Sequence, residues 1–260
     1  MKEPFPLRRP SWAFRVVFAF ALASVFCAVA ARQASAADEG VVVPRIVSLG
    51  GSCVKCDLST HKLAGARFVA GNFQHASLVG SDLRGAMFLA SNFSGADFSH
   101  ADLRAATMSG AVFQGAIFAA ANMVGLQAVG SSFADADLTG ARVESGTLVG
   151  TDLRRIKARG AHFDDCNLTG ANLEGGGFEG ASFRSAQLMG AALGDGQFKN
   201  ADFKDANMRG TVIAGADLST AINLTREQVA YTCADHATRL PAGLTPRLCV
   251  GHVFIVRRNP

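Results

Sequence analysis

A five-residue period constrains the fold of this chain more than any other feature. The period runs without a break from Leu58 to Leu218, and a large apolar residue occupies 31 of its 33 centres. The residue two positions before each centre is usually small, and 19 of these 33 are alanine. An α-helix repeats every 3.6 residues and a flat strand every two, so neither explains a period of five. The chain must therefore turn a corner in each pentad, with two side chains pointing inward and three outward.

The pentads share a local sequence pattern as well as a period. Glycine often ends them, as at Gly80 and Gly115, and its tolerance of positive φ suits a corner. Pentads such as 101–105 (ADLRA) and 171–175 (ANLEG) follow A-[DN]-[LF]-x-x, and across residues 56–220 this pattern resembles the pentapeptide-repeat family. The resemblance implies an all-β fold, a right-handed quadrilateral parallel β-helix (a pentapeptide-repeat solenoid), with one pentad per side and four pentads per coil.

Four sides would stack residues that lie 20 apart in the sequence. One such column has rings at its start and aliphatic side chains at its end: Phe73, Phe93, Phe113, Phe133, Leu153, Leu173, Leu193 and Ile213. Stacking between coils about 4.8 Å apart favours this segregation, and eight coils at that spacing predict a rod about 40 Å long. Two pentads exchange their small and large positions, with Leu126 before Ala128 and Ile156 before Ala158. Each exchange conserves volume, which packed cores tolerate best.

The first 36 residues have the layout of a secretory signal peptide. Basic residues precede an uncharged stretch at 16–31, and small residues follow at 34–36 (ASA). The 16 apolar residues fall short of the roughly 20 that span a bilayer. We therefore predict cleavage after Ala36, a periplasmic or secreted bacterial protein, and no stable membrane span after cleavage. A retained membrane anchor is the alternative.

Removal of the predicted signal peptide changes the charge of the chain. The whole sequence has 25 basic and 21 acidic residues and a pI of about 8.9. Residues 1–36 contain five of the basic residues and one of the acidic ones, which leaves 20 of each. The mature protein is then formally neutral, so the basicity of the whole chain does not indicate a nucleic-acid partner.

The period is lost at both ends, where a solenoid needs caps to cover its apolar core. We predict an N-terminal cap or linker at 37–55 with a covering strand at 41–47, the β-helix at 56–220, and a C-terminal cap at 221–260. Thr225 and Gln228 form a capping-box pattern that predicts a short helix to about His236, the helical part of the cap. A last strand is expected at 250–256.

Five cysteines remain after the predicted cleavage. Cys166 falls on a small inward position, which favours a buried thiol. Cys53, Cys56, Cys233 and Cys249 lie at or beyond the edges of the repeat, and an oxidising compartment favours their pairing. We predict Cys53 with Cys56 and Cys233 with Cys249, although four cysteines permit three connectivities. A redox motif or half of a zinc site at 53–56 is the alternative, without the sequence context that either requires.

The outward residues give no pattern for a catalytic, cofactor or metal site. The histidines fall on different walls or distant coils, and no serine has a histidine and a carboxylate at a matching spacing. Asp82 and Asp102 stack, but Arg84 and Arg104 share their wall, which favours local salt bridges over an acid/base or cation site. A basic cluster is also present, and a surface irregularity explains it better than an acidic partner: Arg154, Arg155, Lys157 and Arg159.

One of the four walls carries charge only at its two ends. Its outward residues include the candidate interaction face, which we expect to be exposed: Val69, Leu89, Val129, Val149 and Met189. Long uncharged surfaces often bind partners. The alternative is that β-branched residues simply suit strands.

The sequence therefore favours a non-catalytic structural or protein-binding solenoid with an unknown protein partner or a second copy as a homodimer. Some pentapeptide-repeat proteins resemble duplex DNA in shape and charge and bind DNA gyrase, so the resemblance implies gyrase binding as an alternative. The export signal and the neutral mature charge disfavour that alternative. An enzyme is disfavoured because solenoid walls without inserted loops offer no pocket that excludes water.

Overall fold

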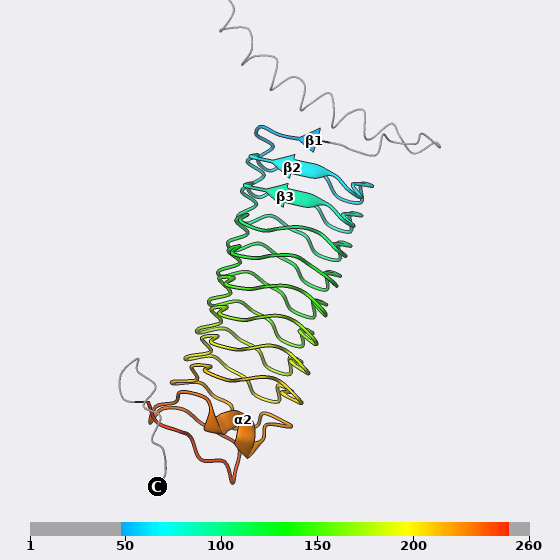
Figure 1. The fold of residues 1–260 in the computed structure, drawn as a ribbon. Coiled ribbons are helices and arrows are strands. Elements are labelled where there is room, and N and C mark those ends of the chain that lie inside the picture. The colour runs from blue at the N-terminus through cyan, green and yellow to red at the C-terminus, as the bar shows by residue number, and fades with distance from the viewer. Residues whose placement is uncertain (1–47, 250–260) are drawn as a thin grey trace, which may run out of the picture. The chain divides into compact units, whose positions relative to one another are not determined.

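The computed structural model describes residues 48–249, which belong to one compact unit. These residues wind into a stack of coils that runs from β1 to α2 (Figure 1). The predicted signal peptide, the strand expected at 41–47 and the strand expected at 250–256 lie outside the described residues.

Parallel pairing between residues of successive coils builds the stack. Strands β1 (Ser48–Leu49), β2 (Arg67–Val69) and β3 (Met87–Leu89) form a parallel sheet in that order. Phe68 pairs with Phe88, and later coils continue in the same register through bridges such as Asp82 to Asp102. This spacing of 20 residues confirms four pentads per coil and a quadrilateral parallel β-helix. The pairing extends N-terminal to the repeat, since Ser48 pairs with Arg67 and Ser52 with Asn72.

A left-handed residue ends every pentad from Gly65 to Gly215 and turns the chain through its corner. Gly65 has φ of 71°, and the amide of Ala66 donates to the carbonyl of Leu63 at 3.0 Å across the turn. Residues other than glycine adopt the same conformation elsewhere, as at His75 (58°) and Asp135 (62°). The corner conformation is therefore a property of the repeat and not only of glycine, although glycine adopts it at the lowest cost.

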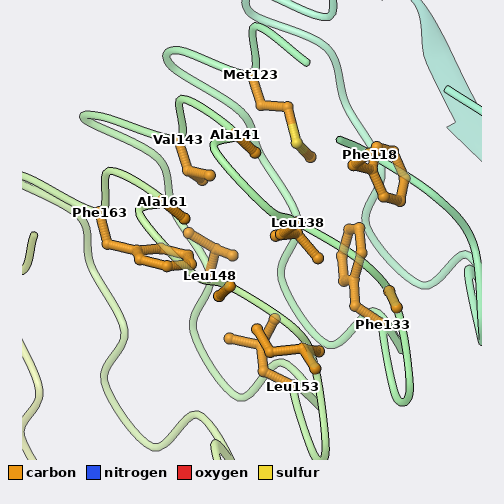
Figure 2. Packing of buried hydrophobic residues seen from close by; sticks show 14 of the residues in the cluster. Phe118, Met123, Phe133, Leu138, Ala141, Val143, Leu148, Leu153, Ala161 and Phe163 are labelled. Carbon is orange, nitrogen blue, oxygen red and sulfur yellow. The ribbon is translucent and has the colours of Figure 1, made fainter. Parts of the chain in front are cut away.

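The core consists of small and large side chains that alternate along the chain within each coil (Figure 2). Along the axis, large residues stack on large ones. Phe73 and Phe93 stack with ring centroids 4.8 Å apart and planes 6° apart, and Phe113 and Phe133 stack at 5.0 Å. These contacts confirm the predicted column. The exchanged residues Leu126, Ala128, Ile156 and Ala158 are all buried, so the two irregular pentads keep both positions inward.

The C-terminal cap begins with α2 (Arg226–Ala230), which is shorter than predicted. The capping box is present, with Thr225 and Gln228 bonded reciprocally. The expected continuation to His236 is wrong because Cys233 returns to the ladder and pairs with Val212. Within the part of the chain that the structure describes, no helix is long and apolar enough to cross a membrane.

Candidate interaction face

The feature that we call the uncharged wall is one side of the β-helix. It comprises the two outward residues of each pentad on the side that begins with β2 and β3: Arg67, Val69, Met87, Leu89, Thr107, Ser109, Gln127, Val129, Thr147, Val149, Asn167, Thr169, Gln187, Met189, Asn207 and Arg209. Parallel bridges join its pentads from Met87 to Asn207 without a gap. The ladder holds these side chains in two straight columns, because each residue stacks on the one 20 positions away.

The wall exposes part of the predicted apolar set. Val69, Val129 and Met189 are 39%, 45% and 42% exposed. Leu89 and Val149 were also expected to be exposed but are half-buried. Two exposed apolar residues that were not predicted from the sequence lie on other walls, Val112 and Ile117. The wall thus alternates apolar side chains with hydroxyls and amides, and Asn207 donates from its amide to the side-chain oxygen of Gln187 at 3.0 Å.

A cavity of about 410 Å³ lies where the uncharged wall meets the C-terminal cap. It is lined by five consecutive residues of the repeat and by four residues of the cap: Asp205, Ala206, Asn207, Met208, Arg209, Thr225, Glu227, Gln228 and Tyr231. The guanidinium carbon of Arg209 lies 4.7 Å from the centre of the Tyr231 ring. Sequence periodicity could not find this cavity because half of its lining comes from the non-repeating cap.

Local ion pairs hold several of the carboxylates on the charged walls. Arg84 donates to both oxygens of Asp82 at 2.8 and 2.7 Å, and Arg104 makes the same pair with Asp102. These hydrogen bonds lower the pKa of each aspartate below its usual value. The stacked pair is therefore a salt-bridged surface, as the sequence favoured, and it holds no carboxyl with the raised pKa of a general acid.

The basic cluster is partly neutralised by neighbouring acids. Arg154 pairs with Asp152 at 2.8 Å, and Arg155 pairs with Asp135 of the preceding coil at 2.7 Å. The other two members, Lys157 and Arg159, are exposed on the adjoining wall. The four cations therefore do not converge on one point that would bind an anion.

A serine, an aspartate and a histidine meet on one charged wall, so the prediction that no serine has a histidine and a carboxylate at a matching spacing is wrong: His162 pairs with Ser182, 20 residues away. The hydroxyl of Ser182 donates to Asp164, and the Nδ1 atom of His162 lies 3.7 Å from the other oxygen of Asp164. The carboxylate stands between the hydroxyl and the imidazole. In a nucleophilic triad the histidine must contact the hydroxyl to take its proton, so this order does not activate Ser182.

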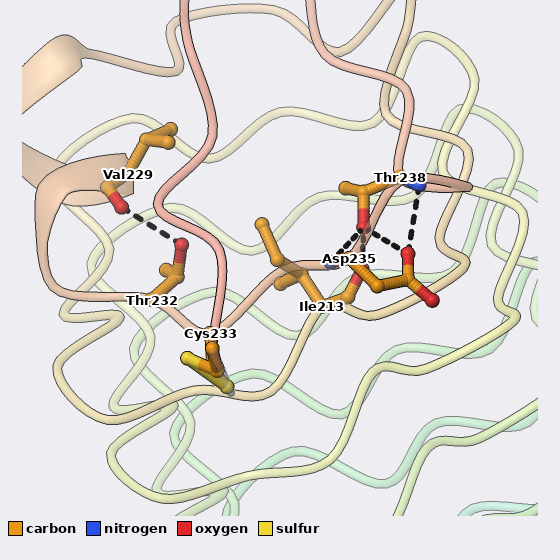
Figure 3. Close-up of a disulfide and its surroundings, with 7 residues drawn as sticks. Ile213, Val229, Thr232, Cys233, Asp235 and Thr238 are labelled. Carbon is orange, nitrogen blue, oxygen red and sulfur yellow. Dashed lines mark hydrogen bonds between the residues drawn. A yellow bond between two sulfur atoms is a disulfide. The ribbon is translucent and has the colours of Figure 1, made fainter. Parts of the chain in front are cut away.

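The structure joins the cysteines in the two predicted pairs. Cys53 is bonded to Cys56 and packs against the first coil of the core. Cys233 is bonded to Cys249 and ties the end of the cap to the ladder (Figure 3). Cys166 is free and buried, and burial raises the pKa of its thiol to about 12. In residues 48–249, no group of three His, Cys, Asp or Glu side chains could hold a metal ion.

Comparisons with known proteins agree with this architecture. A model of pentapeptide repeats matches in eight copies over residues 62–184 and 186–222. Among solved structures, HetL from the cyanobacterium Nostoc, described as involved in heterocyst differentiation regulation, is 24% identical with a TM-score of 0.66. That alignment covers 74% of this chain and 88% of HetL. At this identity, the likeness shows the right-handed quadrilateral β-helix fold alone.

A second solved structure is more distant. QnrB1, a plasmid-mediated fluoroquinolone resistance protein, is 17% identical with a TM-score of 0.42, and the alignment covers 74% of this chain and 90% of QnrB1. Among curated proteins, no sequence matches this chain.

Proposed function

The chain belongs to the pentapeptide repeat family, and we propose that it is a non-catalytic structural or protein-binding solenoid that contacts a protein through its uncharged wall. The observation that carries this proposal is the contrast between the walls. Ion pairs occupy the charged walls, whereas the uncharged wall presents Val69, Val129 and Met189 with no charge between Arg67 and Arg209. Apolar side chains in an uncharged, continuous ladder favour contact with another protein surface.

The chemistry of the described residues supports a binding role over catalysis. The Ser182 hydroxyl contacts a carboxylate, and the Cys166 thiol is buried with a raised pKa. The cavity beside α2 brings together Asp205, Glu227 and Arg209 but contains no cysteine, histidine or serine. An acyl-transfer reaction would need a nucleophile and a base in contact there.

Gyrase binding by mimicry of DNA remains the alternative that the family suggests. A DNA-like surface needs dense negative charge along the rod. Here aspartates on the charged walls alternate with arginines, as in Asp82 with Arg84 and Asp152 with Arg154. This interleaving of charges does not favour the alternative.

We place the protein in the periplasm or outside a bacterial cell. Support comes from the signal-peptide layout of residues 1–36 and from the two cysteine pairs, since disulfides persist in oxidising compartments. Both observations point to export, and neither depends on the partner.

The proposal is tested on protein recovered from the periplasmic fraction of its host. Its mature N-terminus, determined by mass spectrometry, should be Ala37. The variant Leu89→Lys/Val149→Lys places two charges on the uncharged wall and should lose the bound protein partner or change the oligomeric state. A matched control, Val112→Lys/Ile117→Lys, adds the same charge to other walls and should behave as wild type. If the first variant keeps both the partner and the oligomeric state, the wall has no binding role.

A further inference from the structure

The uncharged wall reads almost the same from either end. The wall has two columns of outward residues, and we call the one that follows the buried centre of each pentad the outer column. It contains, in order, Val69, Leu89, Ser109, Val129, Val149, Thr169, Met189 and Arg209. Counting inward from the two ends, Leu89 corresponds to Met189, Ser109 to Thr169, and Val129 to Val149. Apolar residues match apolar residues and hydroxyls match hydroxyls. The inner column consists of the outward residues that precede each buried centre. In it, Thr107 likewise corresponds to Asn167, and Gln127 to Thr147.

This symmetry has a geometric consequence. When two copies pack wall to wall about a two-fold axis perpendicular to the rods, the rods run antiparallel and each column faces its own copy. Every residue then meets its counterpart from the opposite end. A two-fold axis along the rods would instead place the inner column against the outer one, with Gln127 against Val129 and Gln187 against Met189. The antiparallel arrangement therefore joins like side chains over the six central positions of the outer column, from Leu89 to Met189. Unlike residues meet only outside this stretch, where Val69 faces Arg209, and in the inner column, where Met87 faces Gln187.

We propose that the occupant of the uncharged wall is a second copy of this chain, packed antiparallel to form an isologous dimer. This inference rests on the proposed function and names the partner of the same face. Two flat sheet faces pack about 10 Å apart. At that distance, Val129 of one copy contacts Val149 of the other at the centre, and Leu89 contacts Met189 on either side.

Each end of the wall brings two arginines and two acids together in this arrangement, because Arg209, which lies over its own Tyr231, faces Val69 beside Arg67 of the other copy. Arg67 is exposed, and its side chain makes no ion pair or hydrogen bond within residues 48–249. In the dimer it faces Asn207 of the other copy, beside the 410 Å³ cavity. Two carboxylates, Asp205 and Glu227, line that cavity, and neither is paired within the same described range. The cavity therefore offers two acids to a cation that the other copy brings, twice in each dimer.

The size of the wall predicts a weak dimer. Seven coil spacings of about 4.8 Å and a strand of three residues give a face of roughly 34 by 10 Å. Such a face buries on the order of 400 Å² from each copy, which places it among small, transient interfaces. We therefore expect a dissociation constant in the micromolar range, on the order of 10 µM.

The register is tested by two double variants with opposite outcomes, analysed by sedimentation velocity over a series of concentrations. Val129→Lys/Val149→Lys puts lysine against lysine and should raise the dissociation constant at least about tenfold. Val129→Glu/Val149→Lys puts glutamate against lysine in the antiparallel register and should keep the dimer. Equal loss in both variants would overturn the antiparallel register.

Crosslinking provides an independent measurement. Ser109 and Thr169 are three coils apart in one chain but face each other between copies. A short bifunctional thiol crosslinker should therefore join Ser109→Cys/Thr169→Cys into a covalent dimer and leave Ser109→Cys alone monomeric. The native Cys166 is buried and does not compete. A dimer formed by the single variant would indicate the parallel arrangement and overturn the proposal.

The end contact has its own test. Arg67→Glu should weaken the dimer, and adding Asp205→Lys and Glu227→Lys should restore it. Failure of this rescue removes the end contact. A chain that stays monomeric up to on the order of 200 µM overturns the dimer as a whole. If that monomer still captures another protein, and the wall variant Leu89→Lys/Val149→Lys loses it, the proposed function stands without the dimer.

Discussion

At the scale of single residues, the fold depends on which of the two inward positions in a pentad is large. The regular order places the small residue first and the large residue at the centre, where it stacks on its neighbours one coil away. Leu126 and Ala128 reverse this order, yet both are fully buried. Glycine occupies the small position one coil later, at Gly146, and the same occurs at Gly176 after the exchange at Ile156. The core therefore conserves volume over neighbouring pentads and not only at each position.

A double-mutant cycle at the first exchange measures this compensation. Leu126→Ala should destabilise the protein by about 2–5 kcal/mol because it leaves a cavity. Ala128→Leu should cost about 1–3 kcal/mol because it overpacks the coil. The double variant restores the regular order and should be more stable than the sum of the single effects implies, by on the order of 2 kcal/mol. Urea unfolding measures all four proteins, and additive effects would show that the two positions share no space.

At the scale of elements, the caps close a stack that could otherwise continue. The helix α2 is only five residues long, so its own hydrogen bonds cannot stabilise it. Gln228 supplies the missing stability. Its amide donates to the carbonyls of Phe203 and Ala206 at 2.8 and 2.9 Å, while its side-chain oxygen accepts from the amide of Thr225. One side chain thus caps the start of the helix and joins it to the last complete coil.

Substitutions at Gln228 separate these two roles. Gln228→Ala removes both and should cost about 2–3 kcal/mol. Gln228→Glu keeps an acceptor for the capping box but turns a carboxylate toward two carbonyl oxygens, so it should destabilise at least as much at neutral pH. Arg226→Ala, an exposed helix position, is the matched control and should change stability by less than about 0.5 kcal/mol. Thermal unfolding followed by circular dichroism distinguishes these variants, and a glutamate variant as stable as wild type would show that the contacts to the coil are unimportant.

At the scale of the whole molecule, repeated ion pairs make the charged walls sensitive to acid. Hydrogen bonds from Arg84, Arg104 and Arg154 lower the pKa values of Asp82, Asp102 and Asp152. A carboxyl whose pKa is lower in the folded state stabilises that state above its unfolded pKa of about 3.9. The contribution disappears as the pH falls through the folded value, because the protonated carboxyl no longer favours the folded state.

We therefore expect a melting temperature that is nearly constant between about pH 5 and 7 and that falls below about pH 4. The triple variant Asp82→Asn/Asp102→Asn/Asp152→Asn removes three of the titrating groups. It should melt lower than wild type at pH 7 and lose less on acidification. Melting curves across this range test the point, and an equally steep acid decline in the variant would assign the effect to other carboxyls.

The repeat in the sequence specifies the coil and the core. Each pentad repeats the same local choice of small residue, large residue and corner, and each coil imposes its register on the next, so the information is present many times over. The stacked rings at Phe73 and Phe93 and the buried Cys166 could be predicted for that reason.

Features that depend on contacts made once follow from the tertiary structure and not from the repeat. The helix ends at Ala230 because Cys233 returns to the ladder, and Arg155 selects Asp135 from the preceding coil. The order of Ser182, Asp164 and His162 and the cavity beside α2 also arise where particular side chains meet. A period specifies the positions that repeat, whereas these contacts depend on side-chain reach and on a cap whose sequence has no period.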